Sequence, residues 1–387
     1  MNRGPWIDHF GDNFLWSNAT LILKGMAPYG VVALEEIDRV CERLRPRWGE
    51  ENAWPEEWRR MGVMIEDRAE AALAKGHQLT AANYFLRAGI YHYNAERFMY
   101  PGPEKRAQSA IAYKCWHAGI RLGEPTIEFV EVPYQGTTLP ALFMRAEGTN
   151  GKPAPTIVIV NGMDNAKEMS IFFAAREFAR RGFNSLALDG PGMGETRRIR
   201  DMPSRYDYEV PGGAAFDYLA SRPDVDAKRI VSFGYSFGGY YSSRIAARDH
   251  RFAACVALSA LHWDLAAWQE KIRLQNLNAP TKVAQSNFQF RWVVGAETQE
   301  EGIEIAKQFT LKDVAKEMVC PFLVTHGGND RVVPVENAQK LYDAVGSKDK
   351  SIKIFSTEEG GAEHAHVDNR QVGIDFAADW LQDRLQG

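Results

Sequence analysis

The residue best suited to covalent chemistry in this sequence is a serine between two glycines. It lies in Gly234-Tyr235-Ser236-Phe237-Gly238, which joins an apolar run typical of a buried strand to a run with the spacing of a helix. A sharp turn between a strand and a helix strains such a serine, and the glycines leave room for the two elements to approach. The helix N-terminus also favours negative charge on the attacking oxygen. The segment predicts Ser236 as a nucleophile; the alternative is a small residue that only completes a tight turn.

A serine hydroxyl is a weak nucleophile, so it needs a histidine base and an acid that orients the base. In chains with this nucleophile turn, the acid and then the histidine follow the serine. Asp330 follows the apolar run 321–327 and is predicted as the acid, although Asn-Asp is also turn chemistry. His364 is predicted as the base because it directly follows the flexible turn 360–363. His366 lies nearer the next helix and is the alternative base; we expect it to contact the substrate or to support the site.

Two other histidines lie close to apolar runs. His326 ends a run but precedes the acid, and His262 follows the sixth run, where it could border a pocket. We interpret both as packed or hydrogen-bonded residues rather than catalytic ones.

The oxygen that becomes negative when a serine attacks a carbonyl needs two backbone N–H donors. One is expected from Phe237, directly after the nucleophile. The other is expected from Met163, in the loop after the apolar run 156–160. These two amides are the predicted oxyanion hole.

The same loop carries a charged candidate for substrate binding. Asn165 and Glu168 have the spacing of a capping box, which predicts that a helix starts there. Asp164 then lies just outside the helix and points either into the pocket, toward a substrate hydroxyl or amine, or into solvent.

The elements that must position these residues change in pattern near residue 123. Between residues 55 and 122, three stretches have apolar residues at three- and four-residue spacing, which predicts helices. Beyond them, an alternating stretch that turns at Gly136 predicts a hairpin. Short β-branched runs then alternate with helical stretches, which indicates a parallel sheet buried on both faces. The stretch from about 262 to 316 interrupts this alternation and is interpreted as a helical insertion.

These patterns predict a helical N-terminal domain over residues 1–123 and an α/β core over residues 124–387. A length of 387 residues accommodates two domains. The formal net charge of −4 offers no basic field for nucleic acid. No apolar run approaches the roughly 20 residues that cross a bilayer, and acidic residues interrupt any N-terminal signal. The four cysteines have no metal-ligand spacing. We expect a cytoplasmic protein that binds neither membrane nor nucleic acid.

Five motifs together resemble a known family. They are NGMDNAKE at 161–168, DGPGMGE at 189–195, GYSFGG at 234–239, HGGND at 326–330 and GGAEHAH at 360–366. The set resembles the α/β-hydrolases that include bacterial 2,6-dihydroxypseudooxynicotine hydrolase, the fungal yellowish-green pigment polyketide-shortening hydrolases and the fermentation-respiration switch protein group.

The resemblance implies an α/β-hydrolase fold with a mostly parallel, doubly wound sheet. It implies that the helical N-terminal region and the insertion form a cap over the active site. It also implies a homodimer without a metal or organic cofactor. In the nicotine-pathway relative a glutamate after the oxyanion loop contributes to the site, and Asp164, one methylene shorter, fills its place here.

Three functions are compatible with these features. The resemblance favours hydrolysis of a carbon–carbon bond next to a carbonyl in an aryl or polyketide 1,3-diketone. A carboxylesterase or acyl-peptidase would use the same Ser-His-Asp triad. A non-catalytic interaction protein of the switch-protein type is the third reading, although it would not need all three residues. Aromatic residues of the N-terminal helices either line a pocket for a small aromatic substrate or form core; they are Trp54, Trp58, Tyr84, Phe85, Tyr91, Tyr93 and Phe98.

Overall fold

The computed structural model groups the chain into two compact units. The helical unit contains residues 1–127 together with 272–289, and the sheet unit contains residues 128–271 and 290–387. Within these ranges the structure describes residue 4 and residues 6–11, 13–163, 165–260, 263–277 and 288–386. Across these described ranges, no helix combines the length and the apolarity that crossing a bilayer requires.

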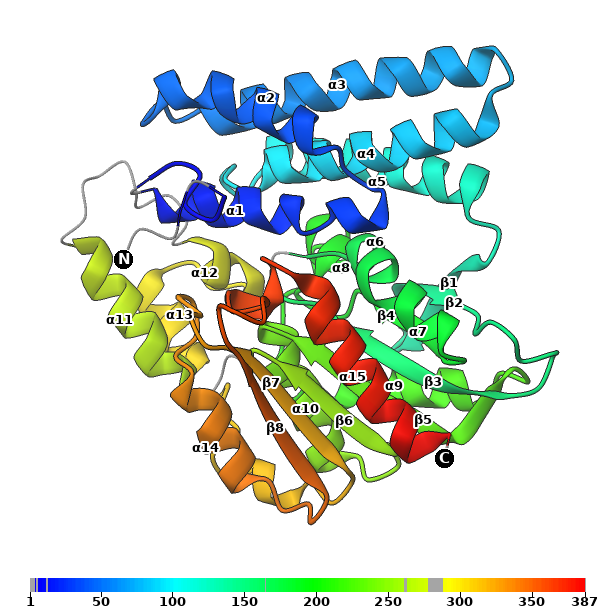
Figure 1. The fold of residues 1–387 in the computed structure, drawn as a ribbon. Coiled ribbons are helices and arrows are strands. Elements are labelled where there is room, and N and C mark those ends of the chain that lie inside the picture. The colour runs from blue at the N-terminus through cyan, green and yellow to red at the C-terminus, as the bar shows by residue number, and fades with distance from the viewer. Residues whose placement is uncertain are drawn as a thin grey trace. The chain divides into compact units, whose positions relative to one another are not determined.

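The helical unit is built on three long helices that pack side by side. Its helices are α1 (Phe14–Lys24), η1 (Ala27–Tyr29), α2 (Leu34–Leu44), η2 (Arg45–Arg47), α3 (Ala53–Ala74), α4 (Gln78–Glu96) and α5 (Pro103–Gly123). Close packing of α4 on α5 depends on small residues. A β-carbon on Gly89 would overlap the ring of Trp116, and one on Gly119 would overlap Leu86. The three helices predicted between residues 55 and 122 therefore form one layer of packed helices (Figure 1).

The aromatic residues of this unit are mainly core. Five of the seven named above are buried: Trp54, Trp58, Phe85, Tyr91 and Tyr93. Their rings contact one another; the Trp54 and Trp58 centroids lie 5.6 Å apart, and those of Trp58 and Tyr91 lie 5.8 Å apart. Burial of such large rings stabilises the unit by the hydrophobic effect.

The sheet unit has eight strands in the order β1-β2-β4-β3-β5-β6-β7-β8. Their bounds are β1 (Ile127–Tyr134), β2 (Thr137–Met144), β3 (Ala154–Val160), β4 (Asn184–Leu188), β5 (Val225–Tyr235), β6 (Ala254–Leu258), β7 (Phe322–Gly327) and β8 (Lys350–Phe355). β2 pairs antiparallel with β4, and every pairing from β4 through β8 is parallel. The prediction of a mostly parallel, doubly wound sheet is confirmed.

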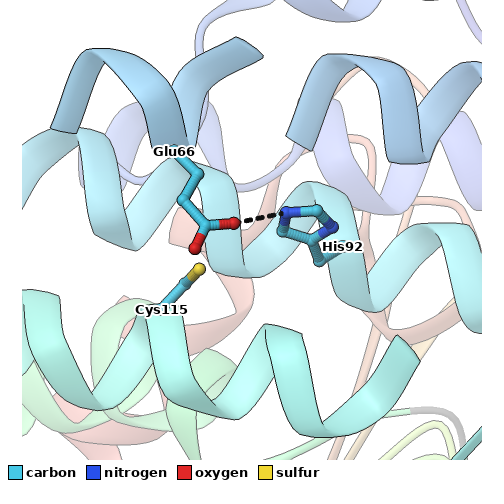
Figure 2. Close-up of side chains that lie close together, drawn as sticks. All are labelled: Glu66, His92 and Cys115. Atoms are coloured by element: carbon cyan, nitrogen blue, oxygen red, sulfur yellow. Dashed lines mark hydrogen bonds and ion pairs between the residues drawn. The ribbon is translucent and has the colours of Figure 1, made fainter. Parts of the chain in front are cut away.

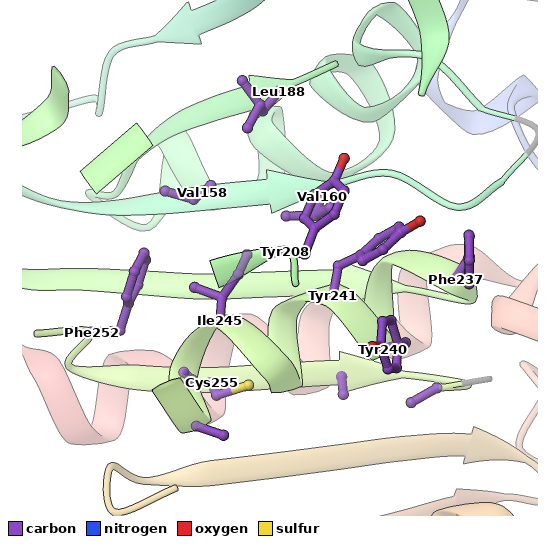
Figure 3. Close-up of a cluster of buried hydrophobic side chains, with 14 of the residues drawn as sticks. Val158, Val160, Leu188, Tyr208, Phe237, Tyr240, Tyr241, Ile245, Phe252 and Cys255 are labelled. Atoms are coloured by element: carbon purple, nitrogen blue, oxygen red, sulfur yellow. The ribbon is translucent and has the colours of Figure 1, made fainter. Parts of the chain in front are cut away.

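Helices cover both faces of this sheet. They are α6 (Lys167–Ser170), η3 (Ile171–Ala175), α7 (Arg176–Arg180), α8 (Gly194–Arg198), α9 (Glu209–Ala220), α10 (Phe237–Arg248), α14 (Glu336–Ala344), η6 (His364–His366) and α15 (Arg370–Leu385). α9 packs on α10, and α15 packs on α7, with α15 in front of the strands in Figure 1. Figure 3 shows Tyr241 and Ile245 of α10 gathered with Val158 and Val160 of β3 in the core on one face.

The described part of the segment after β6 is largely helical, as predicted. The described residues between β6 and β7 form α11 (Leu265–Leu277), α12 (Phe288–Val294), α13 (Gln299–Ala306) and η5 (Ala315–Glu317). Residues 272–289 group with the helical unit, and the rest of the segment groups with the sheet unit. His262 lies outside the described residues.

Candidate active site

Ser236 lies on a strained turn between β5 and α10. Its φ of 56° and ψ of −122° belong to a region that residues with a β-carbon rarely adopt, which costs of the order of 1–3 kcal/mol. The Ser236 amide donates to Leu258 O at 2.8 Å, so the turn is fixed to the neighbouring strand. A β-carbon on Gly238 would overlap Val160 O, and one on Gly234 would overlap Gly238 O. Both glycines are therefore needed for the close approach of strand and helix.

Three of the predicted residues form one chain of hydrogen bonds. The Ser236 hydroxyl lies 2.8 Å from Nε2 of His364, and Nδ1 of His364 lies 2.7 Å from Oδ2 of Asp330. The other carboxylate oxygen of Asp330 accepts from the amides of Val332 and Val333, both at 2.8 Å. The structure thus brings together a hydroxyl, an imidazole and a carboxylate from loops that follow three different strands.

The Asp330 side chain is fully buried, and its charge is held by its partners. Burial alone would raise its pKa, but the charge and hydrogen bond of His364, with contributions from His326 and the Val333 amide, outweigh burial and lower the pKa. Asp330 is therefore ionised at neutral pH, as an acid that orients a histidine must be.

His366 does not take part in this chain. Its side chain is 1% exposed, and Nδ1 donates to Gly361 O at 2.6 Å while Nε2 accepts from the Thr325 hydroxyl at 2.8 Å. Burial lowers its pKa to about 4, which keeps the ring neutral. Since both ring nitrogens are engaged inside the protein, the structure argues against the substrate contact predicted for His366. The ring instead anchors the loop that presents His364.

Two further residues, which were not predicted from the sequence, hold this loop. The Asp368 carboxylate accepts from the amides of Ala362 and Glu363 at 3.1 and 3.0 Å. The Ser259 hydroxyl, at the end of β6, accepts from the Ala365 amide at 3.0 Å. Nothing in the residue spacing distinguishes Ser259 from other serines. Asp368 could have been noticed as an Asp that follows the histidine loop directly.

The loop after β3 lies against the nucleophile. A β-carbon on Gly162 would lie 3.3 Å from the β-carbon of Ser236, and Met163 is the next residue of this loop. Phe237 is the first residue of α10, and its ring is buried against Phe309 with centroids 5.5 Å apart. The role of the Phe237 and Met163 amides as oxyanion donors stays a prediction. Asp164, the predicted substrate contact, lies outside the described residues.

The capping box predicted in this loop is wrong. The helix begins at Lys167 with Ala166 as its N-cap, and the alanine side chain makes no capping hydrogen bond. Asn165 instead donates from Nδ2 to the Tyr235 hydroxyl at 3.1 Å. The capping acceptor comes from a distant part of the chain, because Oδ1 of Asp189 accepts from the Lys167 amide at 2.9 Å.

Asp189, the first residue of DGPGMGE, joins the loops after β3 and β4. It is fully buried and also accepts from Asn161 Nδ2 at 2.7 Å and from the Glu195 amide at 2.8 Å. Lys167 Nζ lies 3.3 Å from its second oxygen. Burial of the carboxylate outweighs the neighbouring lysine and raises its pKa to about 6. Asp189 therefore bonds residues on both sides of Met163, Asn161 before it and Lys167 after it.

The helical unit contains a separate cluster of Glu66, His92 and Cys115, whose ligand-type atoms lie within 4.8 Å of one another (Figure 2). Such a set could hold a metal ion if His92 offered a bare nitrogen. Gln108 Nε2 lies 3.0 Å from Nδ1 of His92 and donates to the His92 carbonyl at 3.2 Å.

The side-chain amide of Gln108 determines which ring nitrogen of His92 carries the proton. Since Gln108 points donors at Nδ1, the proton of the neutral ring belongs on Nε2, which lies 3.2 Å from Glu66 Oε2. Burial raises the pKa of the Cys115 thiol to about 12, so the free thiol is protonated. The hydrogen bonds of this cluster therefore fit a structural contact between α3, α4 and α5 better than a metal centre.

Comparison with known proteins adds sequence and structural relatives. The profile of the prolyl oligopeptidase family matches residues 213–387. Alpha/beta hydrolase gkaG of Penicillium citrinum is 29% identical over 363 residues, which cover 83% of each chain. The 20-hydroxy-prefusarin hydrolase FUS2 of Gibberella moniliformis is 26% identical and covers 90% of this chain and 91% of its own.

Among solved structures, the 2,6-dihydroxy-pseudo-oxynicotine hydrolase superposes with a TM-score of 0.76 at 23% sequence identity, covering 94% of this chain and 95% of that one. The sheet order, the nucleophile turn and these relatives define an enzyme of the hydrolase class with the α/β-hydrolase fold. The resemblance inferred from the five motifs is confirmed for the oxynicotine hydrolase and for fungal α/β-hydrolases.

Proposed function

We propose that this enzyme is a serine hydrolase that cleaves a carbon–carbon bond next to a carbonyl in an aryl or polyketide 1,3-diketone. The observation that carries the proposal is the unbroken chain from the strained Ser236 through His364 to Asp330, with both bonds under 3 Å. A hydroxyl bonded to an imidazole that is itself bonded to a buried carboxylate is the arrangement that activates a serine.

The first half of the proposed reaction forms an acyl-enzyme. Nε2 of His364 takes the Ser236 proton while Oγ bonds to the carbonyl carbon, and the carbonyl oxygen becomes negative. The amides of Phe237 and Met163 donate to that oxygen, each supplying roughly 3–4 kcal/mol if they behave like other oxyanion donors. Asp330 stabilises the imidazolium through Nδ1. The intermediate then collapses, and the electron pair of the carbon–carbon bond leaves with a carbon atom that the second carbonyl stabilises as an enolate.

The second half restores the enzyme. The imidazolium of His364 gives its proton to the departing carbanion and becomes neutral again. The same ring then takes a proton from water, which attacks the acyl carbon, and Oγ of Ser236 leaves with that proton as the acid product is released. No step requires a metal or an organic cofactor.

The choice of bond is supported by the resemblance rather than by geometry. The resemblance to the diketone-cleaving group favours the carbon–carbon bond and a small, uncharged aromatic substrate, together with a homodimer. The match to the prolyl oligopeptidase profile over residues 213–387 favours an ester or acyl-peptide instead, because the same triad would expel an alcohol or an amine.

Two experiments test the proposal. A fluorophosphonate probe should label the wild type and fail to label Ser236→Ala. Ser243→Ala removes a buried serine hydroxyl of the same helix, which bonds Gly239 O at 2.8 Å, and should still be labelled. Absence of labelling in the wild type would favour the non-catalytic reading. A panel of aryl 1,3-diketones and p-nitrophenyl esters then separates the two chemistries, since turnover of esters alone would refute the diketone proposal.

A further inference from the structure

A second histidine contacts the acid of the proposed triad. His326 is in β7, and its side chain is completely buried. Its Nε2 lies 3.0 Å from Val333 O and 3.3 Å from Oδ2 of Asp330. Asp330 Oδ2 is also the oxygen that bonds His364. Two imidazoles therefore meet on one carboxylate oxygen, and the proposed mechanism uses only one of them.

The neighbours of His326 fix its tautomer. A backbone carbonyl can only accept, so the contact with Val333 O places the ring proton on Nε2. Burial lowers the pKa of His326, and the nearby charge of His364 acts in the same direction, so the ring stays neutral. Nδ1 then carries a bare lone pair, and among the described residues it has no hydrogen-bond partner. A neutral N–H is thus donated to the carbonyl of Val333, whose own amide bonds Asp330.

This N–H lies beside the hydrogen-bonded carboxylate of Asp330. Oδ1 accepts from the amides of Val332 and Val333, and Oδ2 bonds Nδ1 of His364, while Nε2 of His326 lies 3.3 Å from Oδ2. The partial positive charge of this N–H, close to Oδ2, contributes to lowering the pKa of Asp330 and so stabilises its charged form. Because this donor is neutral, it does not repel the imidazolium as a cation would. The titratable groups that act on His326 are Asp330, His364 and Glu336, and His326 acts in turn on His366.

We propose that His326 is a positioning residue that holds Asp330 in place and, through Asp330, sets the basicity of His364. This inference rests on the proposed triad. Loss of the N–H leaves a carboxylate that is less restrained and more basic, so His364 should bind its proton more tightly. The same loss should slow the reaction, because a misplaced acid no longer aligns the imidazole with Ser236.

The experiment compares His326→Leu, His326→Asn and His326→Gln. The leucine has no donor, and the asparagine amide is too short to reach the place of Nε2. The glutamine amide does reach it. The pKa of His364 is followed by NMR with labelled histidine, and His364→Asn assigns the signal. The second-order rate of fluorophosphonate labelling at Ser236 is measured over the same pH range. Thermal unfolding identifies any variant that does not fold.

In the leucine and asparagine variants, we expect the pKa of His364 to rise by about half a unit to one unit and the labelling rate to fall about tenfold. His326→Gln should restore both values toward those of the wild type. If His326→Leu does not fold, the asparagine and glutamine pair makes the same comparison. A pKa of His364 that is the same in all variants would overturn the inference, even if the rate falls, because a purely structural role would move only the rate.

The outcomes separate this inference from the proposed function. If the wild type is labelled at Ser236 and the His326 variants match it in rate and pKa, the inference fails and the triad stands. If the wild type is not labelled, the proposed function fails, and the NMR titration still decides whether His326 sets the pKa of His364 through Asp330.

Discussion

Replacement of His366 by asparagine should change how the stability of the protein depends on pH. Burial lowers the pKa of His366 from 6.5 to about 4, so the unfolded chain binds a proton at a higher pH than the folded protein does. The stability that depends on the neutral ring is therefore complete above pH 6.5 and is lost as the pH falls toward 4. Asparagine does not titrate, and its amide nitrogen takes the place of Nδ1, which donates to Gly361 O.

The size of the effect follows from these two values. At about 1.4 kcal/mol per pH unit, titration of His366 should remove about 2 kcal/mol of stability between pH 8 and pH 5 and about 3 kcal/mol by pH 4. This is a large share of the roughly 5–15 kcal/mol that stabilises a typical domain. At pH 8, His366→Asn should be less stable than the wild type by about 1–3 kcal/mol, because Nε2 no longer accepts from Thr325.

The assay is urea unfolding at pH 8, 7, 6 and 5, followed by circular dichroism. The gap between the wild type and His366→Asn should shrink by about 2 kcal/mol from pH 8 to pH 5. Thr325→Val serves as the control, because it removes the hydroxyl bonded to Nε2 but leaves the buried histidine able to titrate. Parallel stability curves for the wild type and His366→Asn would contradict this prediction, since they would mean that the ring titrates alike in the folded and unfolded states.

Three other substitutions test the nucleophile turn and the acid. Ser236→Gly should abolish labelling, because the nucleophile is lost. In urea titrations its free energy of unfolding should be higher by about 1 kcal/mol, because glycine tolerates the φ of 56°. A less stable variant would show that the backbone at Ser236 is not strained. Gly238→Ala should destabilise by more than about 3 kcal/mol, because the new β-carbon would overlap Val160 O; a wild-type melting temperature would show that the turn can relax. Asp330→Asn should lower turnover about 10⁴-fold through the wrong His364 tautomer, with the fold intact by circular dichroism, and a near wild-type rate would remove Asp330 from the mechanism.

Local patterns in the sequence predicted most of the fold because the formation of helices and strands depends mainly on residues that are close in sequence. The alternation of β-branched runs and helical stretches predicted the parallel sheet and the helical segment after β6. The change of period near residue 123 predicted where helices give way to strands, and α5 ends at Gly123. The prediction of a capping box was wrong because it used only residues close in sequence, whereas the Lys167 amide bonds Asp189 from the loop after β4.

The sequence also supplied the members of the candidate site in order. Glycines on both sides of Ser236, an acid after one apolar run and a histidine after the next were enough to name Ser236, Asp330 and His364. The choice between His364 and His366 rested on one argument about the preceding turn. The structure separates them clearly, since His364 reaches Ser236 while both nitrogens of His366 are engaged elsewhere.

Which residue types follow which strands can therefore be predicted from the sequence, because strand, turn and helix signals are local. Which side chains meet depends on how the strands pair in three dimensions. Ser236 and His364 are 128 positions apart, and they are neighbours because parallel pairing places the ends of β5, β6, β7 and β8 along one edge of the sheet. The contact of His326 with Asp330 and the hydrogen bond from the Ala365 amide to Ser259 also lie at that edge. Such contacts depend on distances across strands, which no spacing along the chain records.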